Sequence, residues 1–135
     1  MKKVILILIL FYNIVFANNY ERKLYEQVIP SIFVAIPVTI YADDDTKNIL
    51  KNSDLFNIVN KCDSTVDLIV GKNFKNLPQS CQDKPIFATS YRWYKKKNSF
   101  GAFYWRKGRP QLKLKKAVIE KFTLTIPENL RKYLK

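Results

Sequence analysis

Apolar and polar residues alternate along the chain in short segments that predict strands separated by short helices. The segment 36–42, IPVTIYA, is β-branched and apolar on both faces, which is typical of a buried strand. Similar apolar runs predict further strands at 55–60, 66–70 and 85–90. Because these strands alternate with helical stretches, the pattern predicts an α/β domain in which neighbouring strands are parallel.

Helical spacing and capping residues predict the helices between the strands. Apolar residues recur at helical spacing up to Val28 and predict a first helix that ends near Pro30. Three aspartates at 43–45 precede a short helix expected at about 45–52, where their carboxylates would cap free N–H groups. The segment 71–79 is expected to hold a short turn or helix.

The segment 99–114, SFGAFYWRKGRPQLKL, predicts a β-hairpin whose turn is Lys107-Gly108, since Gly tolerates a positive φ. Alternation divides its first strand into two faces, which are Phe100, Ala102 and Tyr104 against Gly101, Phe103 and Trp105. A short helix at 115–122 and a last helix opened by Pro127 follow. The whole pattern predicts a small single-domain mixed sheet with βα units and a C-terminal hairpin followed by short helices.

The first 17 residues have the three parts of a secretory signal peptide. Lys2 and Lys3 precede a fourteen-residue apolar run, 4–17, which ends in the small-residue pattern VFA. A bilayer span needs about 20 apolar residues, so an uncleaved membrane anchor is the alternative. We therefore expect export to the periplasm, with residues 18–135 as a single domain.

The chain contains two cysteines and no histidine. In an exported protein Cys62 and Cys81 are predicted to form a disulfide, because each lies a few residues before a strand at the same edge of a parallel sheet. Two thiolates alone would leave a zinc ion half-ligated, which argues against a metal site. Three Gly offer no phosphate-binding loop, and capping accounts for the aspartate cluster. We therefore expect neither an enzyme nor a cofactor.

Positive charge is concentrated in one segment of the chain. Without Lys2 and Lys3, 22 Lys/Arg stand against 11 Asp/Glu. Between Lys84 and Ile119 there are eleven Lys/Arg and no acidic residue. Such a segment predicts a positive surface.

Residues 91–109 interleave seven aromatic residues with seven Lys/Arg. Stacking and phosphate contacts could bind nucleic acid, but export would separate the protein from cellular nucleic acid. A small anionic ligand or an acidic protein surface suits an exported protein better, because Arg binds carboxylate and phosphate in a bidentate manner. The alternative is purely structural: the hairpin aromatics pack in the core and the lysines form a solvated turn.

The two parts of this stretch differ in their pattern. Alternation fails in 91–98, which is expected to be a loop, whereas it is regular in the hairpin. Phe103 and Trp105 are therefore expected to serve mainly the core. The candidate ligand- or partner-binding residues are Tyr91, Arg92, Trp93, Tyr94 and Arg106.

PIFATS, a loop, FGAFYWRKGRPQLKL, a short helix and TLTIPENL follow one another in the C-terminal half. This order resembles the ending of the YfiR-like periplasmic signalling family, although Lys115-Lys116 stand where that family usually has an asparagine. The resemblance implies a periplasmic α/β domain that binds the outer part of a membrane diguanylate cyclase and restrains it, with disulfides that make restraint redox-sensitive. A second resemblance, to one lobe of periplasmic solute-binding proteins, implies a half-size binding module.

The expected function is that of a small exported binding protein. It would regulate, or act as sensor accessory to, a membrane-bound signalling protein of the diguanylate-cyclase type. One alternative is a binding module for a small anionic ligand, which would use Arg92, Arg106 and the aromatics around them. Another is an envelope structural protein whose basic face contacts acidic polymers.

We predict that the mature protein begins at Asn18, because signal peptidase accepts the small side chains of VFA before that residue. N-terminal sequencing of protein recovered from the periplasm should give Asn18 as the first residue. Retention of Met1 in a membrane fraction would show an anchored protein instead.

Overall fold

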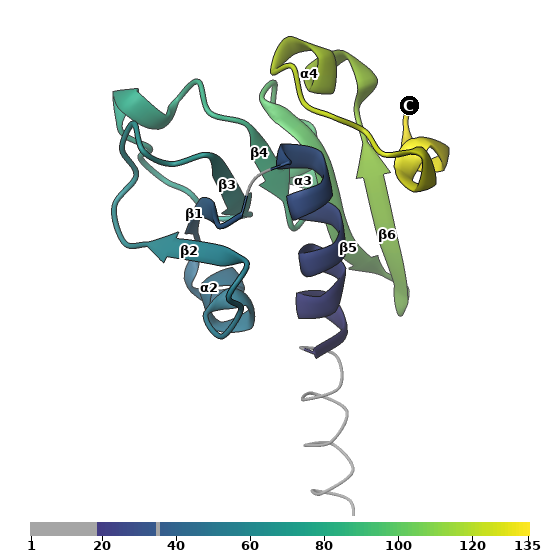
Figure 1. The fold of residues 1–135 in the computed structure, drawn as a ribbon, viewed down its shortest axis with the longest axis horizontal. Coiled ribbons are helices and arrows are strands. Elements are labelled where there is room, and N and C mark those ends of the chain that lie inside the picture. The colour runs from purple at the N-terminus through teal and green to yellow at the C-terminus, as the bar shows by residue number, and fades with distance from the viewer. Residues whose placement is uncertain (1–18, 35) are drawn as a thin grey trace, which may run out of the picture.

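The computed structural model describes residues 19–34 and 36–135, which fold around one six-stranded sheet (Figure 1). The strands are β1 (Val38–Ala42), β2 (Phe56–Val59), β3 (Leu68–Gly71), β4 (Ile86–Ala88), β5 (Ser99–Arg106) and β6 (Arg109–Leu114). Their order across the sheet is β2-β1-β3-β4-β5-β6. All pairings are parallel except the last, in which β5 and β6 form an antiparallel hairpin. The predicted mixed α/β fold is confirmed.

Short helices connect the strands and cover the sheet. They are the N-terminal helix (19–33), α2 (Asp44–Leu50), α3 (Tyr91–Tyr94) and α4 (Lys116–Lys121), with 3-10 helices η1 (Gln79–Cys81) and η2 (Glu128–Tyr133). None of these helices has the length and apolar character that crossing a membrane requires. The predicted signal peptide, 1–17, lies outside the described residues.

The N-terminal helix packs along one face of the sheet and provides much of the core (Figure 1). Tyr25, Ile29 and Ile32 on its inner side are each at most 2% exposed. The Tyr25 ring meets Phe87 of β4 and Phe103 of β5 edge-on, at centroid distances of 5.9 and 6.0 Å. Edge-to-face contacts of this kind are favourable beyond the area that they bury.

The prediction that the first helix ends near Pro30 is wrong, since the helix continues to residue 33. Proline inside a helix costs about 3 kcal/mol, because it lacks an N–H and its ring meets the preceding turn. Ile29 and Ile32, on either side of Pro30, are fully buried in the core. Burying one such side chain contributes about 1.5–3 kcal/mol, so tertiary packing offsets the cost of the proline.

Two further predictions need correction on the chain between β3 and β5. The segment 91–98 is not all loop: Tyr91–Tyr94 form the one-turn helix α3, whose first turn is capped by the Ser90 hydroxyl. The segment 71–79, for which a turn or helix was expected, contains bends but no helix before η1.

The hairpin forms as predicted, with a tight turn at Lys107 and Gly108, which have φ values of 51° and 74°. The predicted faces are wrong at Phe100, which shares the main core with Phe103 instead of facing the same side as Tyr104. The register between β4 and β5 is irregular at this point, because Ile86 pairs with Ser99 while its neighbour pairs with Gly101. The extra residue turns the Phe100 side chain to the other face.

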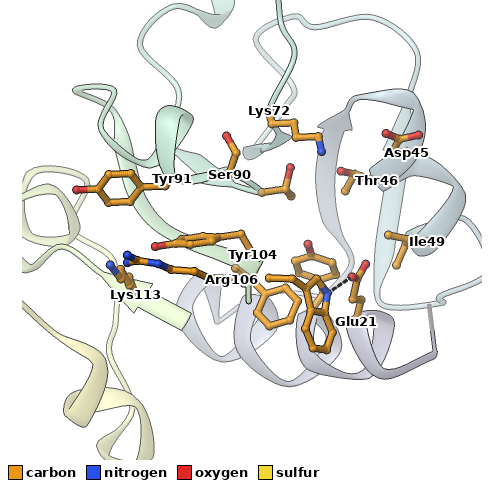
Figure 2. A pocket seen from close by; sticks show the side chains of 14 residues that line it. Glu21, Asp45, Thr46, Ile49, Lys72, Ser90, Tyr91, Tyr104, Arg106 and Lys113 are labelled. Carbon is orange, nitrogen blue, oxygen red and sulfur yellow. Dashed lines mark hydrogen bonds between the residues drawn. The ribbon is translucent and has the colours of Figure 1, made fainter. Parts of the chain in front are cut away.

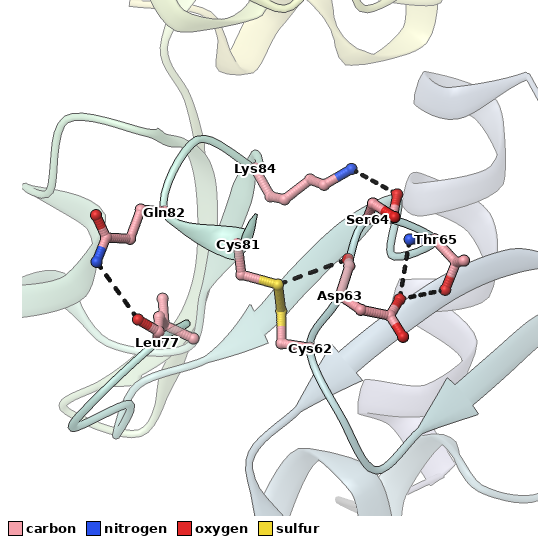
Figure 3. Close-up of a disulfide and its surroundings, with 8 residues drawn as sticks. All are labelled: Cys62, Asp63, Ser64, Thr65, Leu77, Cys81, Gln82 and Lys84. Atoms are coloured by element: carbon pink, nitrogen blue, oxygen red, sulfur yellow. Dashed lines mark hydrogen bonds between the residues drawn. A yellow bond between two sulfur atoms is a disulfide. The ribbon is translucent and has the colours of Figure 1, made fainter. Parts of the chain in front are cut away.

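The second face of the sheet is covered by loops that the disulfide ties together (Figure 3). Cys62 and Cys81 are bonded, with their Cα atoms 6.0 Å apart, and both are buried. They lie at the amino edge of the parallel strands, and together with Val66, Ile69 and Ile86 they form a small apolar cluster. The predicted disulfide is thus present, and it fits an exported protein in an oxidising compartment.

We predict that the double variant Cys62→Ser/Cys81→Ser is less stable than the oxidised protein by about 3 kcal/mol, the chain-entropy value for a loop of this length. Urea unfolding followed by circular dichroism measures the difference. Two alkylatable thiols in the native exported protein would contradict the disulfide itself.

Candidate functional site

A pocket of about 800 Å³ lies at the carboxyl edge of the parallel strands (Figure 2). The chain passes from β1 outward to β2 on one side and then to β3 on the other side, so the strand order reverses between β1 and β3. In open α/β sheets, ligands bind in the crevice outside the carboxyl ends of the strands at such a switch point. The position of the pocket therefore makes it the candidate functional site.

Apolar side chains from three elements form the floor of the pocket. They are Tyr25 of the N-terminal helix, Ile49 of α2 and Phe103 of β5. Burial raises the pKa of Tyr25 well above its usual value, and the charges of Glu21 and Asp43 raise it further. The Tyr25 side chain therefore stays a neutral phenol.

Asp43 joins the two strand ends beside the pocket at the switch point. Its Oδ1 accepts a hydrogen bond from the Thr46 backbone N–H at 3.1 Å and so caps α2. Its Oδ2 accepts from the Lys72 N–H at 2.8 Å, directly after β3. The helix cap predicted from the aspartate cluster is confirmed, and the same carboxylate also holds the end of β3.

Gly71 makes this bridge possible. Its φ is +149°, and a Cβ at this position would come within 2.6 Å of Asp43 Oδ2 and 2.7 Å of the Phe74 ring. Any side chain at position 71 would therefore push the carboxylate away from the Lys72 N–H.

The bridge places polar groups along one wall of the pocket. Thr46 is in the first turn of α2, and Lys72 follows β3. Thr89 and Ser90 follow β4 in the same way. In Figure 2 the Lys72 side chain lies between Ser90 on one side and Thr46 and Asp45 of α2 on the other.

The opposite wall combines tyrosine rings with cations from the hairpin. Tyr91, which is 50% exposed, lies 6.1 Å from the Tyr104 ring between centroids. Lys113 Nζ of β6 lies 5.1 Å from the Tyr91 centroid and 5.8 Å from that of Tyr104. Arg106 lies beside Lys113 on this side (Figure 2). Cations held against aromatic faces keep their charge available to a ligand while their orientation is restricted.

Trp105 forms the lower rim of the pocket and contacts the N-terminal helix. Its indole Nε1–H donates a hydrogen bond to Glu21 Oε1 at 2.6 Å (Figure 2). Its ring also packs against Tyr20, at a centroid distance of 5.8 Å. The rim thus connects the end of β5 with the first described turn of the helix.

The pocket lining contains more cations than carboxylates, and only some of these charged groups have a hydrogen-bond or ion-pair partner. Three cations line it, namely Lys72, Arg106 and Lys113, against the two carboxylates Glu21 and Asp45. Glu21 already accepts the indole N–H. Within 19–34 and 36–135, neither Lys72 nor Arg106 has an ion-pair partner. The lining residues therefore carry one excess positive charge, with the Asp43 carboxylate beside the pocket, and Lys72 and Arg106 are the two cations without an ion pair in those ranges.

The structure divides the sequence-predicted binding residues into two groups. Tyr91 and Arg106 come together as lining residues of the pocket. Arg92 is exposed on α3 but lies outside the pocket lining.

The other two predicted residues pack into the fold instead of the pocket. Trp93 is half-buried and meets Phe74 edge-on at 5.5 Å, within the cluster that surrounds the disulfide. Tyr94 is buried, with Lys115 Nζ 4.6 Å from its ring centroid. These contacts give both side chains a structural role.

The expectation that Trp105 serves mainly the core is wrong. Its side chain is 44% exposed, whereas Phe103, two residues earlier on the same face, is 2% exposed. β5 extends beyond the part of the N-terminal helix that covers it most deeply. Its side chains therefore still alternate between the two faces, but they become more exposed. A pattern with period two reports the face of a strand but not how far the covering helix extends.

Sequence reasoning missed Lys72, Thr89, Ser90 and Lys113 as lining residues. Lys72 comes just after the predicted strand 66–70, and Thr89 and Ser90 are the last residues of the predicted strand 85–90. The carboxyl ends of parallel strands are where ligands bind. This position in the sequence was an available signal. Lys113 has no comparable signal, since it is one of many lysines in a basic segment.

The groups that line the pocket are suited to contacts with an anion. Hydroxyls, aromatic rings and cations surround the pocket, and the chain has no histidine that could transfer protons near neutral pH. No group of three or more potential metal-ligating side chains occurs within the described ranges. The arrangement can hold an anionic group against Lys72 and Arg106 while a ring or apolar part rests on the floor.

No protein-family model, curated protein or solved structure matches this chain. The resemblances to the YfiR-like family and to a solute-binding lobe therefore stay predictions.

We predict that Phe103→Ala lowers the free energy of unfolding by about 3–5 kcal/mol, the range for removing a buried aromatic ring. Trp105→Ala should cost only about 1–2 kcal/mol, because the ring is half exposed and loses one hydrogen bond. Chemical denaturation of the two variants side by side measures both values. A larger loss for Trp105→Ala than for Phe103→Ala would reverse the assignment of rim and core.

Proposed function

We propose that this protein is an exported, periplasmic binding protein that takes a small anionic ligand with an aromatic or apolar part. The observation that carries the proposal is the convergence of Lys72, Arg106 and Lys113, from three elements, on a pocket with an apolar floor. Sites of this kind combine a mainly apolar lining with a few placed polar groups.

In this proposal each group of the pocket has a role. Arg106 would hold a carboxylate or phosphate in a bidentate manner, and Lys72 would contact the same group from the other wall. The Tyr91 and Trp105 rings would pack against a planar part of the ligand. Hydrogen bonds to charged groups contribute about 1.5–3 kcal/mol each, so two of them can account for selection of anions.

Export is supported by the disulfide and by the signal-peptide pattern of the sequence. Disulfides persist in oxidising compartments such as the bacterial periplasm, and the Cys62–Cys81 bond is buried in the structure. A periplasmic location would give the protein access to small solutes that enter through the outer envelope.

A second proposal is a regulator or sensor accessory of a membrane-bound signalling protein of the diguanylate-cyclase type. Besides the C-terminal resemblance, one observation favours it: the pocket rim and the exposed hairpin turn share one edge of the sheet. A partner, or its acidic surface, bound at this edge would detect whether the pocket is occupied.

We predict that phenyl phosphate raises the melting temperature of the protein, because a ligand that binds only the folded state stabilises it by mass action. At ten times the dissociation constant the increase should be about 4 °C or more for a domain of this size. Differential scanning fluorimetry measures it. The double variant Lys72→Gln/Arg106→Gln should lose most of the increase.

Lys97→Gln is the matched control, since Lys97 is exposed and lies outside the pocket. It should retain the full response to phenyl phosphate. Phenol should give a smaller shift than phenyl phosphate, because it lacks the anionic group. Equal shifts with phenol and phenyl phosphate, or an equal loss in Lys97→Gln, would contradict the proposed site.

A further inference from the structure

The turn of the hairpin carries exposed cations outside the pocket. Lys107 and Arg109 flank Gly108 and are both exposed, and neither lines the pocket. Arg106 adds a third exposed cation at the end of β5. In the part of the chain that the structure describes, none of the three forms an ion pair. The turn is therefore a concentrated positive projection.

Two exposed aromatic rings lie directly beside these cations. Trp105 is 44% exposed and Tyr20 of the N-terminal helix is 41% exposed, and both belong to the few large apolar side chains that reach solvent. Their centroids are 5.8 Å apart. Trp and Tyr favour the boundary between water and a bilayer, because one end of each side chain is apolar and the other polar.

The acidic groups near this surface are already engaged. Glu21 accepts the Trp105 indole N–H, and Glu26 pairs with Arg22 at 3.8 Å on the N-terminal helix. Asp45 lies across the pocket on α2. Among the residues that the structure describes, no carboxylate forms an ion pair with the cations of the hairpin turn.

The same end of the molecule is where the described chain begins. The first described turn of the N-terminal helix lies beside the end of β5, as Figure 1 and the Tyr20–Trp105 contact both show. The sequence just before it is the apolar run 4–17 with Lys2 and Lys3 at its start. The hairpin turn and the first described turn of the helix therefore lie at the same end of the domain (Figure 1).

We propose that one end of the domain docks on an anionic membrane surface. This end is formed by Tyr20, Trp105, Arg106, Lys107 and Arg109. The cations contact lipid phosphates, and the two rings enter the headgroup region. The inference rests on the proposed export for its location but not on the ligand proposed for the pocket. Docking would hold the pocket edge toward the membrane, where a membrane-bound partner could reach it.

Co-sedimentation with vesicles tests the proposal. The exported protein is purified from the cell envelope and mixed with two kinds of vesicle. One kind contains phosphatidylcholine alone, and the other contains about 30% of the anionic lipid phosphatidylglycerol. We expect stronger binding to the anionic vesicles. Each cation near an anionic surface changes the partition coefficient about fivefold, so Lys107→Gln/Arg109→Gln should lower binding about 25-fold.

The matched control is Lys96→Gln/Lys97→Gln, which removes the same charge from another exposed site. These lysines precede the amino end of β5, whereas the turn follows its carboxyl end, and eight strand residues span about 26 Å. This separation exceeds the Debye length of about 8 Å at physiological salt. The control variant should bind anionic vesicles nearly as well as the unchanged protein.

Fluorescence tests the orientation. In a Trp93→Phe background Trp105 is the single tryptophan of the domain, and its emission should shift to shorter wavelength only with anionic vesicles. A retained N-terminal segment would itself favour anionic vesicles through Lys2 and Lys3, so the turn is tested by comparing the two double variants, which share that segment.

Equal loss of binding in the two double variants would overturn the proposal, since it would show attraction by net charge alone. Absence of any preference for anionic vesicles would overturn it as well, even if the protein bound an acidic protein surface. Neither Lys107 nor Arg109 lines the pocket. The response of Lys107→Gln/Arg109→Gln to phenyl phosphate should therefore be unchanged, and this separates failure of docking from failure of the ligand site.

Discussion

The bridge made by the Asp43 carboxylate is the interaction on which the candidate site depends. One oxygen caps α2 through the Thr46 N–H, and the other accepts the Lys72 N–H after β3. β1 and β3 pair with each other as far as Ala42 and Val70, and beyond these residues the carboxylate ties the helix after β1 to the residue after β3. The bridge requires a glycine at position 71, because any Cβ there would collide with the carboxylate. The bridge therefore depends on two residues together, the Asp43 carboxylate as acceptor and Gly71 as the residue that leaves room for it.

The proposed function follows from what this edge brings together. With the ends of β1 and β3 held close, Lys72 reaches the pocket from one wall, while Arg106 comes from the hairpin on the other. The floor is apolar, and the hydrogen bond from Trp105 to Glu21 closes the rim against the N-terminal helix. In the proposed site the sheet fixes the backbone positions from which the two cations reach the ligand, and this lowers the ordering that binding requires.

The sequence predicted those features that depend on local pattern or on compartment. The disulfide followed from the position of two cysteines before parallel strands, and the hairpin followed from alternation around Gly108. Features set by distant packing were not predictable in this way. The helix continues through Pro30 because the sheet buries its neighbours, and Phe100 changes face because the register slips by one residue. For the site, Arg106 was singled out for its chemistry, whereas Lys72 was missed although it lies just after a predicted parallel strand.

The central claim is that an anionic ligand binds at the carboxyl edge between these two walls. The most direct test is a ¹H–¹⁵N NMR titration of the labelled protein with phenyl phosphate. The account predicts that the largest amide shifts fall on Lys72, Thr89 and Ser90 and on the end of β5 near Arg106. Largest shifts around Lys96 and Lys97, at the opposite edge of the sheet, would show binding to the general basic surface and would contradict it.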